Sequence, residues 1–105
     1  MQNKNRNFNE RCYELLKLIP EGKVTTYKEM ANALNTKAWR AVGSAMAKNK
    51  SLFVIPCHRV VRSDGAIGEY ALGPDKKTEL LIKEGVAVKN GRVKDLGKVI
   101  FRFSI

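Results

Sequence analysis

Apolar side chains recur every three or four positions across residues 8–19. This is the spacing of one face of an amphipathic helix, and Pro20 and Gly22 should end that helix. Cys12 lies on the apolar face, so we expect its thiol to pack in the core.

The next segment predicts two short helices joined by a tight turn. A brief strand at Val24 leads into the tetrapeptide TYKE, which fits a capping box with Thr26 as the N-cap and Glu29 three residues later. The first helix should cover residues 27–34, and the second should run from about residue 37 to 48. This arrangement is the outline of a helix-turn-helix.

The second of these helices is rich in small residues, namely Ala38, Ala41, Gly43, Ser44, Ala45 and Ala47. Small side chains let a helix backbone approach another surface closely. That surface is either a partner such as DNA or the protein's own core, and the pattern alone leaves both open. Arg40 stands among these residues, where a contact to a phosphate or a base would be natural.

The middle of the chain has the pattern of short strands. Residues 52–55 are an apolar run too short for a helix and bounded by Pro56, which indicates a buried extended segment. Basic and β-branched residues at 58–62 predict a strand, and Ser-Asp-Gly at 63–65 predicts a turn. Residues 66–70 are then expected to return as a second strand.

The last third predicts one more helix and a hairpin. Pro74 suits the first position of a helix that runs to about Glu84, with Gly85 ending it. Valines on both sides of the Asn-Gly pair at 90–91 predict the hairpin. Charged and apolar residues alternate over 98–105, so this tail is expected to be an edge strand. The whole pattern predicts a mostly α protein with small β elements.

Length and charge narrow the class of protein. The 105 residues suit one domain, and the formal net charge is +10. Positions 1–62 hold 12 basic and 4 acidic residues. A basic half favours nucleic acid as the partner, because neutralising phosphates releases counterions, although a solvated basic surface has the same composition. No apolar run is long enough to span a membrane, and the N-terminus lacks the apolar region of a secretory signal. We therefore expect a cytoplasmic protein without membrane contact, which in a prokaryote would be associated with the nucleoid.

Cys57 precedes the chain's one histidine, His58. A thiol attacks as the thiolate, so a base or a positive field is needed at neutral pH. Neighbours in a strand point to opposite faces, so a turn or a bridging water would be required for the two to cooperate. The base would also need a carboxylate to orient it. Four carboxylates remain candidates: Glu84, Glu69, Asp64 and Glu79. The alternative is an inert buried thiol.

Several blocks of the chain resemble the O6-alkylguanine-DNA alkyltransferases. IPCHRV at 55–60 looks like their active-site signature. Further matching blocks occur in order, namely Thr26-Tyr27, RAVGSAM at 40–46, Asn49, GAIG at 65–68 and KEG at 83–85. The resemblance covers about residues 8–86 and implies the family's C-terminal catalytic and DNA-binding domain, with a winged helix-turn-helix-like fold. We expect one domain over 1–105, with 87–105 as a basic extension and without the family's N-terminal domain.

The resemblance implies a single-turnover DNA repair reaction. An O6-alkylguanine would be flipped out of the duplex, and Cys57 would take its alkyl group irreversibly. By the same resemblance, His58 deprotonates Cys57 through a water and Glu84 orients His58. Tyr27 would protonate the departing guanine, and Asn49 would tie the recognition helix to the active-site segment. Neither a cofactor nor a metal is expected.

The resemblance also implies how DNA is held. The small-residue helix would enter the minor groove of double-stranded DNA, Arg40 would replace the flipped nucleotide, and Tyr27 would help to rotate it. Further DNA contacts are expected from Ala41, Gly43 and Ser44, and the guanine pocket from Met46, Val60, Tyr70 and Ala71. The backbone carbonyls of Cys57 and Val60 are expected to read the exocyclic amine of the guanine. The protein is expected to act as a monomer.

Ala71 and Leu72 depart from the family pattern, which often has Ser-Gly-Gly in this loop. Ala71 lacks a hydroxyl for the guanine O6, and Leu72 is expected to narrow the pocket. Two rival classes also remain. Alkyltransferase-like proteins match the chain in size, bind alkylated DNA without repairing it and signal to other repair pathways. They typically carry tryptophan where Cys57 stands. A plain winged helix-turn-helix regulator would leave Cys57 and His58 unexplained.

Overall fold

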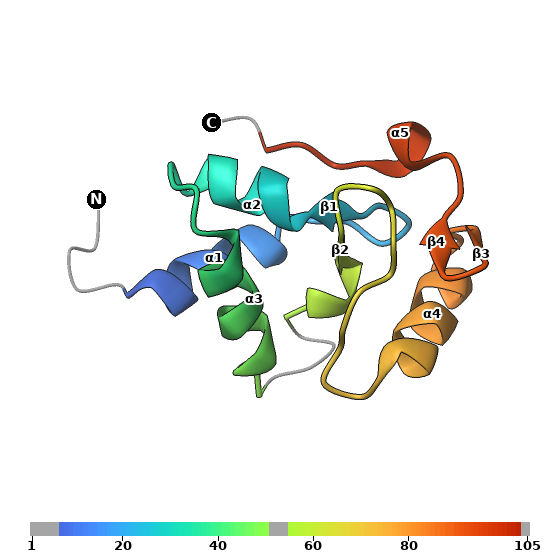
Figure 1. The fold of residues 1–105 in the computed structure, drawn as a ribbon, viewed down its shortest axis with the longest axis horizontal. Helices are drawn as coiled ribbons and strands as arrows, with labels where there is room; N and C mark the ends of the chain where they lie inside the picture. Colours follow the sequence, from blue (N-terminus) through green and yellow to red (C-terminus); the bar gives the residue numbers. More distant parts are fainter. Residues whose placement is uncertain (1–6, 51–54, 104–105) are drawn as a thin grey trace.

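The computed structural model describes residues 7–50 and 55–103. In chain order the elements are α1 (Phe8–Leu16), β1 (Thr25–Thr26), α2 (Tyr27–Ala33), α3 (Trp39–Ala47), a 3₁₀ turn (Cys57–Arg59), β2 (Val60–Val61), α4 (Pro74–Lys83), β3 (Val88–Lys89), β4 (Arg92–Val93) and α5 (Leu96–Val99). Figure 1 shows α1, α2 and α3 at one end of the molecule and α4 with the β3–β4 hairpin at the other. The prediction of a mostly α protein with small β elements is confirmed.

A short parallel pair, β1 and β2, lies between these two ends. Thr25 pairs with Val60 and Thr26 with Val61, and the chain between the strands supplies α2 and α3. Successive strand side chains point to opposite faces. Val60 therefore packs with the core of α1, α2 and α3, whereas Val61 packs with the core of α4 and the hairpin. The turn that carries Cys57 leads directly into this pair.

The helix-turn-helix forms as predicted. The Thr26 hydroxyl accepts the Glu29 backbone N–H at 3.1 Å and so caps α2. The small residues of α3 divide between two faces. Ala45 is fully buried in the core, whereas Ser44 is exposed and a Cβ built on Gly43 would meet no atom within 4 Å. Core packing therefore accounts for Ala45 but not for Gly43, which leaves an open surface on the helix.

The end of α4 positions Glu84. The helix C-cap is Glu84, and Gly85 follows it with φ +94°. Gly85 N–H donates to the carbonyl of Ile82, and Val86 N–H donates to the carbonyl of Leu81, each at 2.9 Å. This pair of bonds is a Schellman motif, and it turns the chain away from the helix immediately after the Glu84 side chain.

The first predicted helix is shorter than expected. α1 ends at Leu16, and the next turn continues with tighter bonds from Leu18 to Leu15 and from Ile19 to Leu16. The hairpin is confirmed, with Val88 opposite Val93. The predicted strand over 52–55 falls largely on residues 51–54, which lie outside the described residues.

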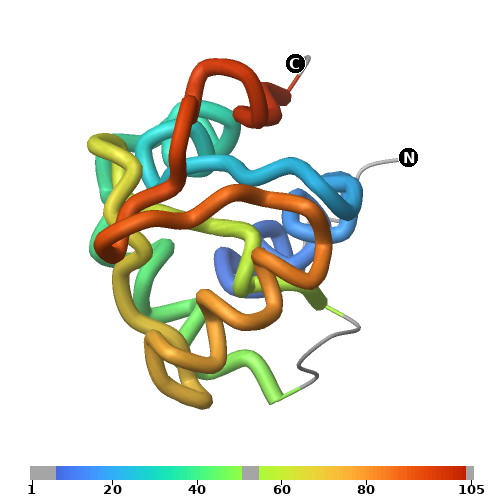
Figure 2. Tube along the Cα trace, turned by 90° about the vertical axis from the view of Figure 1, so that its right-hand side faces the viewer, coloured from blue at the N-terminus to red at the C-terminus, as the bar shows by residue number. Residues whose placement is uncertain are grey.

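The strand predicted over 58–62 is limited to β2, because residues 57–59 form the 3₁₀ turn. Two other predicted strands are wrong. Residues 66–70 do not form a strand, because Gly68 adopts φ +75° and only Ala66 makes an antiparallel bridge, to Arg92. In the tail, residues 98 and 99 belong to α5, and Ile100 makes a single parallel bridge to Val24. Beyond it the chain runs across the top of the molecule above β1 and α2 in Figure 1, and in the turned view of Figure 2 this last segment stays at the upper edge.

Aromatic packing accounts for the alternating pattern of the tail. Phe101 and Phe103 pack edge to face with ring centroids 5.3 Å apart, and both contact the α1–α3 core. Residues 104–105 lie outside the described part of the chain. Within the described residues, no helix combines the length and apolar character needed to cross a bilayer.

Candidate active site

Cys57 lies at the first position of a 3₁₀ turn. Its N–H donates to the carbonyl of Ile55 at 2.8 Å, and the N–H of Arg59 donates to Pro56 at 3.0 Å. Because these residues form a turn and not a strand, the side chains of Cys57 and His58 are not forced to point to opposite faces. Both side chains are buried, with exposures of 4% and 2% for the two residues.

The Cys57 thiol lines a cavity of about 440 Å³ between α2, α3 and the loop after β2. Its other lining residues are Tyr27, Arg40, Gly43, Ser44, Met46, Ala47, Glu69, Tyr70 and Ala71. Most of the residues predicted for DNA contact or for the guanine pocket are therefore gathered around one thiol. Ala41 is half-buried and does not line this cavity, and the Val60 side chain is fully buried in the α1–α3 core.

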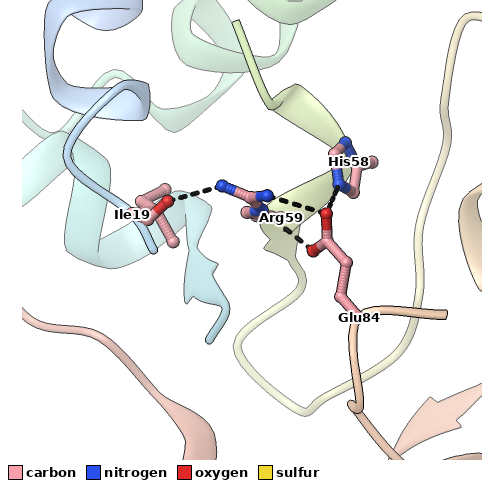
Figure 3. A network of polar contacts seen from close by, with 4 residues as sticks. All are labelled: Ile19, His58, Arg59 and Glu84. Carbon is pink, nitrogen blue, oxygen red and sulfur yellow. Dashed lines mark hydrogen bonds and ion pairs between the residues drawn. The ribbon is translucent and has the colours of Figure 1, made fainter. Parts of the chain in front are cut away.

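His58 is held by Glu84, as Figure 3 shows. The distance from His58 Nε2 to Glu84 Oε2 is 2.9 Å. The other three candidates take no part in this contact: Glu79 pairs with Lys76, Asp64 pairs with Arg92, and Glu69 lies on the wall of the cavity. Glu84 is therefore the carboxylate that orients His58.

Arg59 completes this network in a role that the sequence pattern did not indicate. Its guanidinium donates from Nε to Glu84 Oε1 at 2.9 Å and from Nη2 to Oε2 at 2.7 Å. Nη1 donates to the carbonyl of Ile19 at 2.7 Å (Figure 3). A backbone carbonyl in the turn after α1 thus anchors the arginine, and the arginine fixes the carboxylate in a two-pronged contact.

The contact with Glu84 selects the tautomer of His58. A carboxylate accepts, so Nε2 carries the proton and Nδ1 is left as an acceptor. Nδ1 is buried and has no hydrogen-bond partner within residues 7–50 and 55–103. Burial lowers the pKa of His58, with Arg59 and Lys77 acting in the same direction and Glu84 against it. His58 is therefore neutral near pH 7 and able to accept a proton.

The resting state of Cys57 is the thiol. Burial raises its pKa, while a hydrogen bond with the Asn49 side chain and the positive charge of Lys77 act against this rise. Asn49 Nδ2 also donates to the carbonyl of Ile55 at 2.9 Å. Asn49 thus connects the end of α3 to the backbone just before Cys57, as predicted by resemblance.

Lys77 is a second residue that sequence reasoning missed. It is fully buried on α4, and its Nζ donates to the carbonyl of Glu69 at 3.1 Å. Burial lowers its pKa to about 8. Its ammonium favours the Cys57 thiolate and holds the backbone of Glu69, a residue of the cavity wall. The sequence did contain a signal for its burial. Lys77 lies four residues before Leu81, which is buried, so the lysine is on the apolar face of the helix.

Two tyrosines frame the thiol. Burial raises the pKa of Tyr27, and a negative charge on Cys57 would raise it further, so its hydroxyl remains protonated and able to donate. The Tyr70 hydroxyl is buried without a hydrogen-bond partner in the described parts of the chain. The rings of Tyr70 and His58 meet edge to face with centroids 6.3 Å apart.

Leu72 is 49% exposed and does not line the cavity. The structure therefore does not support the expectation that Leu72 narrows the pocket.

Comparisons with known proteins give this site its context. The family model described as "6-O-methylguanine DNA methyltransferase, DNA binding domain" matches residues 7–86. A methylated-DNA–protein-cysteine methyltransferase of Rattus norvegicus is 45% identical over 89 residues, which are 83% of this chain and 43% of the rat protein. The chain therefore spans less than half the length of this curated relative.

Solved structures agree with this match. The O6-methylguanine-DNA methyltransferase of Pyrococcus kodakaraensis strain KOD1 superposes with a TM-score of 0.71 at 48% identity, covering 78% of this chain and 48% of that one. S. pombe Atl1, in complex with damaged DNA containing O6-carboxymethylguanine, superposes with a TM-score of 0.80 at 29% identity, covering 97% and 99%. Because the match extends over most of its length in both sequence and fold, the chain belongs to the 6-O-methylguanine DNA methyltransferase family.

Proposed function

We propose that this protein repairs O6-alkylguanine in DNA by transferring the alkyl group to its own Cys57. The observation that carries the proposal is the thiol in a cavity next to a histidine whose Nε2 contacts Glu84 and whose Nδ1 has no hydrogen-bond partner among the described residues. Relatives named methylated-DNA–protein-cysteine methyltransferases support the same chemistry.

The reaction is a displacement at the alkyl carbon. His58 Nδ1 receives the proton of the Cys57 thiol through a water, and Glu84, held in place by Arg59, stabilises the imidazolium that forms. The thiolate sulfur forms a bond to the alkyl carbon as the bond from that carbon to O6 breaks. The guanine leaves with the electron pair, and Tyr27 supplies its proton. The product is a thioether, which is a poor leaving group, so each molecule reacts once.

DNA would approach over α3. Arg40 and Ser44 are exposed on this helix, and Gly43 leaves its backbone open beside the cavity that holds Cys57. A small-residue helix suits a narrow minor groove, and the net charge of +10 favours a polyanion. The Mycobacterium tuberculosis and S. pombe relatives were both solved in complex with DNA. A nucleotide rotated out of the duplex would reach the thiol between Tyr27 and Arg40.

The deciding experiment is intact-mass analysis after incubation with a duplex that carries one O6-methylguanine. The expected result is the gain of one methyl group, mapped to the Cys57 peptide and absent from Cys57→Ala. A matched duplex with unmodified guanine is the control. No mass gain under conditions of saturated, lesion-selective binding would refute alkyl transfer.

One observation favours a second candidate, a lesion-binding protein that does not transfer the alkyl group. Atl1 of S. pombe matches nearly the whole chain in both directions and was solved on DNA containing O6-carboxymethylguanine. This candidate predicts a preference for alkylated over unmodified duplex in both wild type and Cys57→Ala, without any change in mass. The buried network of His58, Arg59 and Glu84 would then have no catalytic use, which is why we favour transfer.

A further inference from the structure

A second cavity, of about 720 Å³, shares Tyr27 with the cavity that holds Cys57. It lies between α2, the start of α3 and the turn after β2, and its lining includes Lys28, Lys37, Trp39 and Arg62. Its size is within the range of sites that hold small ligands. The alkyl-transfer steps do not use it.

Trp39 gives this groove an aromatic wall. Its side chain is 56% exposed at the first residue of α3, so it adds little to the core. An exposed indole presents a flat π-face on which any nucleobase can stack. Trp39 is also the one tryptophan in the chain, so its fluorescence reports on this groove directly.

The groove is also cationic. Lys28, Lys37 and Arg62 are exposed, and the lining residues include no aspartate or glutamate. In the part of the chain that the structure describes, none of the ion pairs involves these three cations. Cations beside an aromatic face suit a ligand that carries phosphates and a base. An acidic peptide would use the cations but would leave the indole exposed.

We propose that this groove binds a second, unstacked nucleotide of the DNA, with its base against Trp39 and its phosphates against Lys28, Lys37 and Arg62. Tyr27 would then separate two nucleotides of a locally opened strand, one in each cavity. The inference rests on the proposed function only in taking DNA as the partner. It requires no alkyl transfer, so it can be tested separately.

The test uses Cys57→Ser and short oligothymidylates without alkylated bases, so that no transfer enters the readout. Binding should quench Trp39 fluorescence saturably. An oligonucleotide of the same length with abasic sites in place of its bases should bind more weakly and leave the fluorescence unchanged. Trp39→Ala should weaken binding about 5- to 100-fold, measured by anisotropy of a labelled oligothymidylate. Leu18→Ala removes an exposed apolar side chain elsewhere and should leave the affinity unchanged.

Charge is tested with Lys28→Gln, which should lower the affinity and flatten its dependence on salt. Equal quenching by the abasic oligonucleotide, or an unchanged affinity of Trp39→Ala, would overturn the groove proposal. If wild-type protein still gains a methyl group on Cys57 in that case, the proposed function stands without the groove. Base-dependent quenching by a protein that never gains a methyl group would support the groove and refute the transfer.

Discussion

Glu84→Gln tests the central argument of the site, because it keeps the shape of the side chain and removes its charge. In the wild type, the carboxylate accepts two hydrogen bonds from Arg59 and one from His58 Nε2, at 2.7 to 2.9 Å. The side chains of Glu84 and Arg59 are only 12% and 15% exposed. The substitution therefore leaves a largely buried guanidinium without its counter-charge.

The expected loss of stability is large but not disabling. Breaking a buried charge pair by removing one partner costs about 3 kcal/mol or somewhat more, and the residual solvent exposure of this pair favours the lower end. In a domain of this size, about 3 kcal/mol corresponds to a fall in Tm of about 10–20 °C. Domains are typically stable by about 5–15 kcal/mol, so the variant should remain folded at room temperature.

The stability difference should also depend on pH with a definite sign. Burial by itself would raise the pKa of Glu84, but the hydrogen bonds from Arg59 and His58 outweigh it and hold the pKa below its usual value. A carboxyl whose pKa is lower in the folded state stabilises the fold above its unfolded pKa, near 4.3. The advantage of wild type over Glu84→Gln should therefore be complete near pH 7 and decline as the pH falls through the folded pKa.

The effect on reactivity follows from the tautomer of His58. If the new amide in Glu84→Gln keeps its oxygen on Arg59, its NH₂ group faces His58 Nε2, which must then accept. The imidazole proton moves to Nδ1, which can no longer take a proton from Cys57. Losing a general base typically costs about 10²- to 10⁴-fold in rate. We expect a loss of this size in methyl transfer to Cys57.

The rate of methyl transfer is measured by quenched-flow mass analysis, and the reactivity of Cys57 towards iodoacetamide is measured by peptide mapping. Cys12 is an internal reference, because burial raises its pKa to about 11. Glu79→Gln makes the same chemical change on an exposed face of α4 and should behave as wild type. If Glu84→Gln lost the expected stability but transferred methyl at the wild-type rate, His58 would not be acting as the base.

Three further predictions concern the surrounding structure. Lys77→Met should raise the pKa of the Cys57 thiol, seen in the pH profile of iodoacetamide labelling, because it removes a nearby positive charge. The same substitution should stabilise the protein at pH 7 by about 1–2 kcal/mol in chemical denaturation, because the free energy lost by burying the ammonium exceeds the free energy gained from its hydrogen bond. This gain should shrink as the pH rises from the folded pKa of about 8 to the ordinary lysine pKa of 10.5. A destabilised Lys77→Met would contradict this expectation. Thr26→Ala should cost about 1 kcal/mol through the lost α2 cap, whereas Thr26→Ser should be close to wild type in the same measurement. Gly85→Ala should lower the free energy of unfolding by about 1–2 kcal/mol, because it forces alanine into the left-handed region. Gly97→Ala is the control in the same thermal unfolding measurement and should change stability little, because Gly97 has no positive φ and an added Cβ would meet open space.

Local signals predicted most of the framework. The cap at Thr26, the glycine stop at Gly85 and the Asn-Gly turn at 90–91 act over four or five residues, and the structure contains all three. The errors fall where distant contacts decide the conformation. In the tail, apolar and charged residues alternate because Phe101 and Phe103 pack on the α1–α3 core. A strand would give the same sequence pattern, but the described part of this segment does not form a ladder of strand hydrogen bonds.

The candidate site shows the same difference between residues that local sequence signals indicate and residues whose role depends on distant contacts. The residues alone indicated a thiol next to a histidine but left four carboxylates open, and the resemblance selected Glu84. Arg59 and Lys77 were missed because their roles depend on where the backbone of Ile19 and the carbonyl of Glu69 come to lie. The groove at Trp39 likewise exists only because α2, α3 and the turn after β2 meet.

The sequence by itself determined the helical segments, their ends, the basic character and the pairing of a thiol with a histidine, because propensity, capping and charge are properties of short stretches of chain. Only the tertiary structure decided that the Cys57 turn lies between two cores and that His58 meets Glu84 from 26 residues away. It also decided that burial keeps the Cys57 thiol and the His58 imidazole neutral. The physical reason is that hydrogen-bond partners and desolvation depend on which surfaces the whole chain brings together, and no local pattern encodes that proximity.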